Sequence, residues 1–286
     1  MIIVLGASGQ LGTELLSACD SLAFAHAGLT HADIEVENLA SISTALAKYA
    51  GMDNLTVINT AAFHNVDACE KDGDRAFQVN CVGSQNVAQW CRQHGAKYCF
   101  VSTDFIAGTP TDASGLPLSV YAKTKLAGEL AALSICPGAL VVRVGTLYGA
   151  SGCRAKSGGG NFIDTVVGKI KSQQPFSLPD YTSILTTSAH DAAYRILHNL
   201  DRSGVWYGTD WQLPRSHYQI GLELCNILNL TSKIMAVSHD PNDTIRPHTT
   251  SLPEIHRGWA GPQLDSHLPT LCPPLRAYCI EKGYIA

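Results

Sequence analysis

A tyrosine and a lysine stand four residues apart in the stretch SVYAKTKLAGE, residues 119–129. The stretch has helical spacing, so Tyr121 and Lys125 would lie one turn apart on the same face. A lysine in that position favours the phenolate electrostatically, lowers the pKa of the phenol and moves it towards useful proton transfer near neutral pH. The pair could therefore provide an acid for catalysis.

The same spacing occurs again near the C-terminus, at Tyr278 and Lys282, so spacing alone identifies no site. The residues before each pair differ. The predicted strand before Tyr121, at 98–102, ends in the polar residues Ser102, Thr103 and Asp104. A hydroxyl at the end of a strand and a Tyr/Lys pair on the next helix can converge at the crevice of an open α/β sheet. Tyr278 lacks such a strand, and we interpret its pair as ordinary residues of a terminal helix.

The N-terminal stretch VLGASGQLGTELL has the features of a phosphate-binding turn. Gly6, Gly9 and Gly12 follow a predicted strand directly and open a predicted helix. Glycines at these positions permit a tight turn, close approach of the backbone to a pyrophosphate, and packing of helix on strand. The helix N-terminus adds unpaired N–H groups and a positive dipole. The order of strand, glycines and helix predicts a dinucleotide site.

The second strand should end near the adenosine ribose, where an acidic residue usually takes the hydroxyl groups. AHAGLTHADIE offers Thr30 and His31 first, and Asp33 comes later. Polar or basic groups tolerate a 2′-phosphate that an acid would repel, so the sequence favours NADP(H) over NAD(H). His31 is equally consistent with a surface loop residue.

These groups need a scaffold, and the first half of the chain predicts one. Apolar runs that are continuous, as in strands covered on both faces, occur at 2–5, 55–59, 98–102 and 139–144, with a weaker candidate at 22–28. Apolar residues at helical spacing occur between them, at 10–19, 38–50 and 74–95. This alternation predicts an α/β fold with a Rossmann-type, doubly wound parallel sheet.

The second half of the chain is less regular. A Gly/Ser-rich loop at 149–160 precedes a region with many prolines, in which 188–200 is the clearest helix. We expect residues 1–150 to form a dinucleotide-binding Rossmann domain, with returning segments at about 185–212. Residues 151–286 would mainly form a smaller C-terminal α/β substrate lobe.

Composition restricts the partners. The 286 residues are 45% hydrophobic and 15% charged, as in a folded globular protein. The 20 basic and 24 acidic residues give a net charge of -4 without charged blocks, so we expect neither nucleic acid nor membrane as a partner. There is no predicted signal peptide or membrane span, which favours a cytoplasmic location. The 10 cysteines lie in apolar stretches and the 11 histidines lack metal-site spacing, so we expect reduced thiols and no metal.

Taken together, these stretches resemble the extended short-chain dehydrogenase/reductase superfamily and, within it, the dTDP-4-dehydrorhamnose reductase family. The matching stretches, in order along residues 1 to about 200, are GASGQLG, THADIE, VINTAAFHNVDACE, FQVN, VSTDF, PLSVYAKTKLAGE, RVGTLYG and NF. The resemblance implies an NAD(P)H-dependent reductase that acts on a carbonyl of a nucleotide-linked deoxysugar, such as dTDP-4-dehydro-6-deoxyhexose.

The resemblance also implies roles for individual residues. Thr103 would hold the carbonyl oxygen, Tyr121 would protonate it while the nicotinamide delivers hydride, and Lys125 would bind the nicotinamide ribose. The diphosphate loop would comprise Gly6, Ser8, Gly9, Gln10, Leu11 and Gly12. The segment beside the cofactor would be Ala61, Ala62 and Phe63. Asp33 and Ile34 would lie near the adenosine, where the strand end also places Thr30 and His31. Candidates for substrate contact are Asp104, Arg143 and Thr146.

Two of these substrate candidates have an alternative role. Asp104 could simply cap a turn, and Arg143 could pair with a helix carboxylate. The chain also departs from the family pattern where the substrate would enter: the loop at 105–119 is shorter and lacks an aromatic residue and a glutamate, Thr146 replaces a tryptophan, and the loop at 150–160 is inserted.

Other functions remain open from the sequence. The altered loop is compatible with a short-chain reductase for a different, non-sugar carbonyl. A non-catalytic, cofactor-binding regulatory subunit shares this fold, although the complete Thr, Tyr and Lys set argues against that role. An epimerase or dehydratase that keeps its cofactor is a third reading. For the oligomeric state, the hypothesis that we consider is a homodimer.

Overall fold

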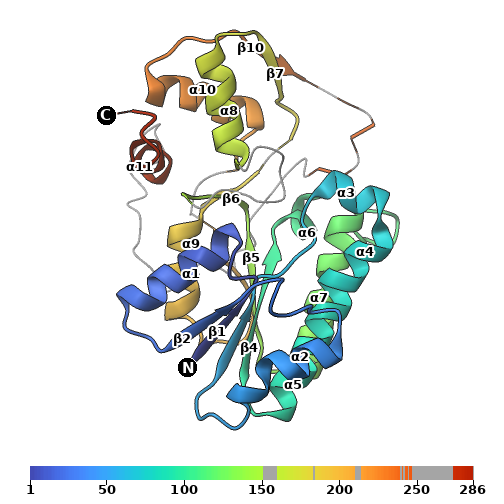
Figure 1. Ribbon diagram of the computed structural model, residues 1–286. Helices are drawn as coiled ribbons and strands as arrows, with labels where there is room; N and C mark the ends of the chain where they lie inside the picture. Colours follow the sequence, from blue (N-terminus) through green and yellow to red (C-terminus); the bar gives the residue numbers. More distant parts are fainter. Residues whose placement is uncertain are drawn as a thin grey trace.

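The computed structural model describes residues 1–150, 160–182, 184–209, 214–238, 240, 242–243, 245–246 and 273–285. Within them, a six-stranded parallel sheet has the order β2-β1-β3-β4-β5-β9 (Figure 1). Its strands are β1 (Ile2–Leu5), β2 (His26–Leu29), β3 (Thr56–Asn59), β4 (Lys97–Thr103), β5 (Leu140–Val144) and β9 (Gly204–Tyr207). The order reverses beside β1, as a doubly wound sheet requires, and the predicted fold class is confirmed.

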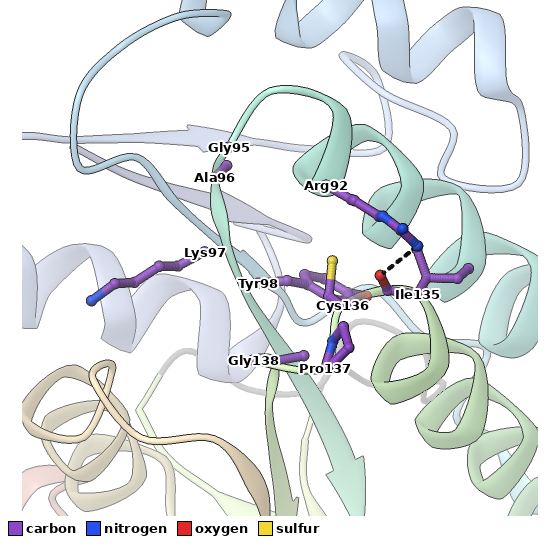
Figure 2. A pocket seen from close by; sticks show the side chains of 10 residues that line it. Arg92, Gly95, Ala96, Lys97, Tyr98, Ile135, Cys136, Pro137 and Gly138 are labelled. Atoms are coloured by element: carbon purple, nitrogen blue, oxygen red, sulfur yellow. Dashed lines mark hydrogen bonds between the residues drawn. The ribbon is translucent and has the colours of Figure 1, made fainter.

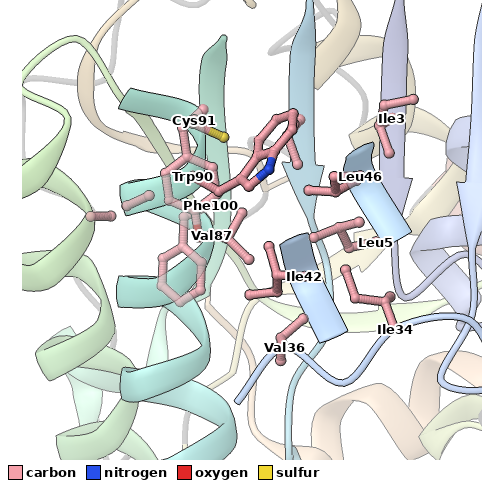
Figure 3. Packing of buried hydrophobic residues seen from close by; sticks show 14 of the residues in the cluster. Ile3, Leu5, Ile34, Val36, Ile42, Leu46, Val87, Trp90, Cys91 and Phe100 are labelled. Atoms are coloured by element: carbon pink, nitrogen blue, oxygen red, sulfur yellow. The ribbon is translucent and has the colours of Figure 1, made fainter. Parts of the chain in front are cut away.

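Helices cover both faces of the sheet (Figure 1). On one face lie α2 (Leu39–Leu46), α5 (Gly83–Gln93) and α7 (Val120–Ile135); on the other lie α1 (Gln10–Ser21) and α9 (Ala189–His198). Alternate residues of β1 enter the two cores: Ile3 and Leu5 pack towards α2 and α5, as Figure 3 shows, while Ile2 and Val4 pack towards α1. This double burial explains the continuous apolar runs of the sequence.

Two predicted elements differ from the observed ones. The second strand begins at His26, later than the predicted 22–28, because Ala23 has φ +56° and completes a turn after α1. The helix predicted over 74–95 is divided into α4 (Gly73–Phe77), a π-helical turn η2 (Gln78–Val82) and α5. A π-helical turn changes the direction of the side chains that follow, and such turns are frequent at functional sites.

A second lobe lies beyond the carboxyl ends of β4 and β5 (Figure 1). Its core is formed by α8 (Phe162–Ser172), α10 (His217–Leu228), α11 (Pro273–Glu281) and the parallel pair of β7 (Phe176–Pro179) and β10 (Ile234–Val237). A short pair, β6 (Thr146–Tyr148) with β8 (Thr186–Ser188), lies between this lobe and the sheet. Short helices η1 (Ala47–Tyr49), α3 (Val66–Lys71) and α6 (Phe105–Gly108) complete the described elements.

The chain enters the second lobe at β6 and returns to the sheet. The segment from β8 through α9 to β9 places β9 in parallel pairing with β5 and packs α9 against α1. The sheet and its helical cover therefore use residues 2–148 together with 189–207, and no described helix is long and apolar enough to cross a membrane.

Most thiols lie in these cores. The described cysteines are free, and the buried ones are Cys19, Cys69, Cys81, Cys91, Cys99 and Cys279. Burial raises the pKa of the Cys19 thiol to about 11, so this group stays neutral and behaves as a small apolar side chain.

The core between α1 and the sheet should be sensitive to cavities. Leu15 is fully buried there, whereas Leu130 on α7 is 60% exposed. We expect Leu15→Ala to lower the free energy of unfolding by about 2–5 kcal/mol and Leu130→Ala by less than about 0.5 kcal/mol. Urea denaturation followed by circular dichroism measures both values; equal losses would contradict this assignment of the core.

Candidate active site

The glycine turn lies at the carboxyl end of β1 and leaves no room for side chains. Gly6 has φ +76°, and a Cβ on it would stand 2.7 Å from Thr60 Oγ1. A Cβ on Gly12 would stand 2.3 Å from the Gly6 carbonyl oxygen. Gly9 is the N-cap of α1, so no side chain covers the first N–H groups of that helix. These N–H groups can receive a phosphate, and the donor set fits a dinucleotide.

The other residues of this turn differ in what they offer. Leu11 is 4% exposed and packs in the core, so only its backbone can face a diphosphate. Gln10 donates from Nε2 to the Gly149 carbonyl oxygen at 3.2 Å, which ties the turn to the segment after β6. Ser8 is half-buried at the apex.

The adenosine end is built around a local turn. Asp33 Oδ2 accepts from the backbone N–H of Thr30 at 2.8 Å and from its hydroxyl at 2.7 Å. These bonds hold the pKa of Asp33 below its usual value. Ile34 is 4% exposed and joins the core, whereas His31 is exposed. The carboxylate of Asp33 thus closes the turn after β2, and the polar groups around it are Thr30 and His31.

The segment Ala61–Phe63 is held by two buried asparagines. Asn59 accepts from Ala61 N at 3.0 Å. Asn80, on the π-helical turn, accepts from Phe63 N at 2.9 Å and donates to Phe63 O at 3.0 Å. The same amide donates to Thr124 on α7 at 3.1 Å. Asn80 was not among the predicted site residues, although FQVN belongs to the family-like stretches; it connects the segment beside the cofactor site to the helix of Tyr121.

Thr103, at the end of β4, is 4% exposed, and its hydroxyl lies near that of Tyr121, where it lowers the pKa of the phenol. The ring of Phe105 packs edge-on against Tyr121, with centroids 5.7 Å apart. Burial raises the pKa of Tyr121 above its ordinary value, and Thr103 opposes this rise. The structure therefore brings together the two hydroxyl groups that the sequence predicted.

Lys125 is placed differently from the prediction. It is 2% exposed, its Nζ donates to the Val101 carbonyl oxygen at 2.7 Å, and it lies 4.1 Å from the centroid of the Phe100 ring. Burial lowers the pKa of Lys125 to about 7, and the nearby charge of Glu129 opposes this shift. The prediction that Lys125 lowers the pKa of Tyr121 is wrong in this structure, because the ammonium group is bound to β4 and burial dominates at the tyrosine.

Arg143 takes the alternative role weighed above. Its Nε and Nη2 donate to the two carboxylate oxygens of Glu129 at 2.8 Å and 2.7 Å, and Nη1 donates to the Tyr207 hydroxyl at 3.1 Å. This bidentate pair joins α7 to β5 in a largely buried setting. Its charge is thus compensated, and we assign Arg143 to the framework rather than to substrate contact.

The remaining predicted positions are Thr146 and the loops at 105–119 and 150–160. Thr146 is half-buried on β6, with its N–H bonded to Leu185 O at 2.7 Å. The short loop after β4 forms α6 and an isolated bridge between Thr111 and Pro117. Of the inserted loop at 150–160, residues 151–159 lie outside the described residues. Arg246 bonds Asp243 of its own segment and reaches Asp67 on α3 at 3.1 Å, so it bridges the two lobes.

A pocket of about 350 Å³ lies at the opposite edge of the sheet. It is bounded by the amino ends of β4 and β5, and Arg92 there donates to the Ile135 carbonyl oxygen at 3.4 Å (Figure 2). None of the residues discussed above as cofactor or catalytic candidates lines it. The site at the carboxyl edge is therefore the candidate active site.

Fold and site define an NAD(P)-dependent oxidoreductase of the extended short-chain dehydrogenase/reductase type. Residues 1–254 match the model of the RmlD substrate binding domain. The chain belongs to this family.

Individual relatives agree with this assignment. The chain is 28% identical to a dTDP-4-dehydrorhamnose reductase of Streptomyces griseus, over 82% of this chain and 81% of that protein. It is 30% identical to a probable dTDP-4,6-dihydroxy-2-methyloxan-3-one 4-ketoreductase of Streptomyces antibioticus, over 72% and 73%. Its fold is similar to the crystal structure of a dTDP-4-dehydrorhamnose reductase from Bacillus anthracis in complex with NADP, with a TM-score of 0.80, 21% identity and 98% of both chains covered.

The glycine turn yields a direct test. In Gly12→Ala, the new Cβ would clash with backbone, so we expect the affinity for NADPH to fall by at least about tenfold. Gly138→Ala is the matched control, because a Cβ there has nothing within 4 Å. Fluorescence titration of both variants measures the affinities; equal binding would contradict a cofactor role for the turn.

Proposed function

We propose that this protein reduces the ketone of a nucleotide-linked deoxysugar, of the dTDP-4-dehydro-6-deoxyhexose class, with NADPH as the preferred cofactor. The observation that carries the proposal is the closeness of the Thr103 and Tyr121 hydroxyl groups at the sheet edge that also holds a glycine turn able to fit a dinucleotide. The named activities of the family members support the substrate class.

Each catalytic residue has a distinct task in this proposal. When bound, the reduced nicotinamide supplies the hydride. Tyr121 holds at its hydroxyl the proton that the substrate oxygen receives, and Thr103 stabilises the phenolate that remains. The ammonium of Lys125 has three donors, of which Val101 takes one, so the others are available to the ribose hydroxyls of the cofactor.

The preference for NADPH rests on the turn after β2. Thr30 donates to Asp33 Oδ2 from both its N–H and its hydroxyl, so this oxygen of the carboxylate is engaged locally. Lys48 is the cation whose charge acts on Asp33. A 2′-phosphate would meet hydroxyl, imidazole and ammonium groups in this region, which is more favourable than a free carboxylate.

The proposal includes the predicted division of labour between the lobes. The sheet with its helices would hold the cofactor, and the second lobe would hold the nucleotide-sugar, with Thr146 facing its sugar. A cytoplasmic homodimer remains part of the proposal, and sedimentation velocity measures the assembly. The alternative is a reductase for a different, non-sugar carbonyl substrate. The short loop at 105–119 favours it by leaving fewer side chains over the proposed substrate site.

A titration distinguishes these substrates. NADPH and NADH are titrated into the protein, each with and without dTDP, and nicotinamide fluorescence reports binding. We expect NADPH to bind at least about tenfold more tightly than NADH, and dTDP to strengthen binding of the reduced cofactor, because the nucleotide would close the site over it. Binding that is indifferent to dTDP would point to a different carbonyl substrate.

Turnover tests the acid. We expect Tyr121→Phe to lower kcat by about 10²–10⁴-fold with little change in cofactor affinity, because only the transferable proton is lost. Tyr278→Phe is the control with the same spacing to a lysine. The Tyr278 hydroxyl bonds Asp164 and accepts from Asn161 at 2.8 Å, so its loss should lower stability by about 1 kcal/mol and leave kcat unchanged. Full turnover in Tyr121→Phe would exclude the mechanism.

A further inference from the structure

Asp104 is an unusual carboxylate for its position. It follows Thr103 at the end of β4, is 1% exposed, and its Oδ2 has no hydrogen-bond partner. Although Asp104 occupies the N-cap position of α6, its side chain makes no cap hydrogen bond, so the turn-capping alternative from the sequence is wrong. A buried carboxylate oxygen without a partner is costly, and such atoms often mark functional groups.

The other oxygen of Asp104 connects to the catalytic hydroxyl groups. Thr103 Oγ1 lies 3.5 Å from Asp104 Oδ1, accepts from Phe105 N at 3.3 Å and is close enough to the Tyr121 hydroxyl to lower its pKa. A threonine hydroxyl has one proton to donate and two lone pairs. Since Phe105 N occupies one lone pair, Thr103 can accept from either Asp104 or Tyr121 and must donate to the other. The hydrogen bonds among Asp104, Thr103 and Tyr121 can therefore be oriented in two ways.

The protonation state of Asp104 selects between these two orientations of the hydrogen bonds. An ionised Asp104 only accepts, so it takes the Thr103 proton, and Thr103 then accepts from Tyr121. A neutral Asp104 can donate to Thr103, whose proton is then directed at the Tyr121 oxygen. The second arrangement is the one that stabilises a phenolate, because an anionic oxygen needs donated hydrogen bonds.

We infer that Asp104 is a positioning residue that acts through Thr103: in its neutral form it directs the Thr103 hydroxyl towards Tyr121 and stabilises the phenolate left by proton transfer. This inference rests on the proposed reductase function. In the step concerned, the carbonyl carbon takes the hydride and its electron pair from the nicotinamide, which is oxidised. The O–H bond of Tyr121 breaks as that of the product alcohol forms, and solvent later returns the proton to Tyr121.

The surroundings of Asp104 favour the protonated, neutral form of its carboxyl group. Burial raises the pKa of Asp104 to about 7, against the opposing effect of backbone N–H groups, first that of Leu185. The titratable groups that act on it are Tyr121 from α7 and Tyr207 from β9, and the Val144 carbonyl oxygen of β5 accepts from Asp104 N at 3.0 Å. The cations of the neighbouring elements, Lys125 and Arg143, are bound to Val101 O and Glu129.

The sign of the pH dependence follows. Below a pH of about 7, Asp104 is neutral and the Thr103 hydroxyl donates towards Tyr121. Above it, Asp104 is ionised and the Thr103 hydroxyl donates to Asp104 instead. We therefore expect kcat for carbonyl reduction to fall by about tenfold per pH unit above the midpoint in the wild type. Asp104→Asn keeps a neutral donor at this position and should retain kcat within about tenfold at pH 6 while losing the alkaline decline.

The control is Asp74→Asn, an exposed carboxylate on α4, which should keep the wild-type profile. Thr103→Val removes the connecting hydroxyl and leaves Asp104 in place, so its residual activity should show no decline, even if Asp104→Asn does not fold. A decline that persists in both Asp104→Asn and Thr103→Val, or that is missing from the wild type, would overturn the inference.

A second readout needs no turnover. Infrared difference titration of the wild type should show a protonated carboxyl band that disappears with a midpoint near pH 7 and is missing from Asp104→Asn. If the protein fails to reduce any deoxysugar ketone but the band titrates there, the proposed function fails and the protonation of Asp104 stands. If turnover is present and no carboxyl group titrates near neutrality, the inference fails and the proposed function stands.

Discussion

The burial of one ammonium group determines the geometry of the site. Lys125 is 2% exposed, and its bond to the Val101 carbonyl oxygen ties α7 to β4. A buried charge without a partner costs several kcal/mol, so alternative registers of helix and strand are strongly disfavoured. Tyr121, one turn earlier on α7, is thereby held opposite Thr103 at the end of β4. The proposed catalytic hydroxyl pair depends on a lysine whose contacts are made inside the protein.

Further polar bonds keep the same helix in place from two other sides. Glu129 lies one turn beyond Lys125 and is clamped by Arg143 of β5. Asn80 bonds Thr124 and the backbone of Phe63, so the segment Ala61–Phe63 is tied to α7. These groups are buried, and buried polar networks specify one arrangement when every member is satisfied. The orphaned oxygen of Asp104 stands out against this background.

The sequence was informative where a single physical cause decides the structure. Continuous apolar runs predicted strands buried on both faces, and glycines between strand and helix predicted a turn that excludes a Cβ. Spacing, however, states only which face of a helix a residue shares. It could not tell that Lys125 would reach the strand behind it rather than Tyr121, nor that Arg143 would find Glu129. The break at Gln78–Val82 was also missed, because the segments on both sides of it are helical and together predict one helix. The bonds of Asp33 to Thr30 were missed for a related reason: they are local and leave no periodic signal.

The return of the chain from the second lobe affects how the protein folds as it is synthesised. The last strand of the sheet, β9, and the helix that covers α1 are translated only after β6 and α8. Until then, the edge of β5 and the apolar face of α1 lack their partners, and open edges and apolar faces favour aggregation. At typical rates of synthesis, the roughly sixty residues between β5 and the end of β9 keep this face exposed for on the order of several seconds. The nascent chain therefore passes through a stage in which its cofactor-binding half is nearly complete yet unable to close, and chaperones that shield apolar surface would act at this stage.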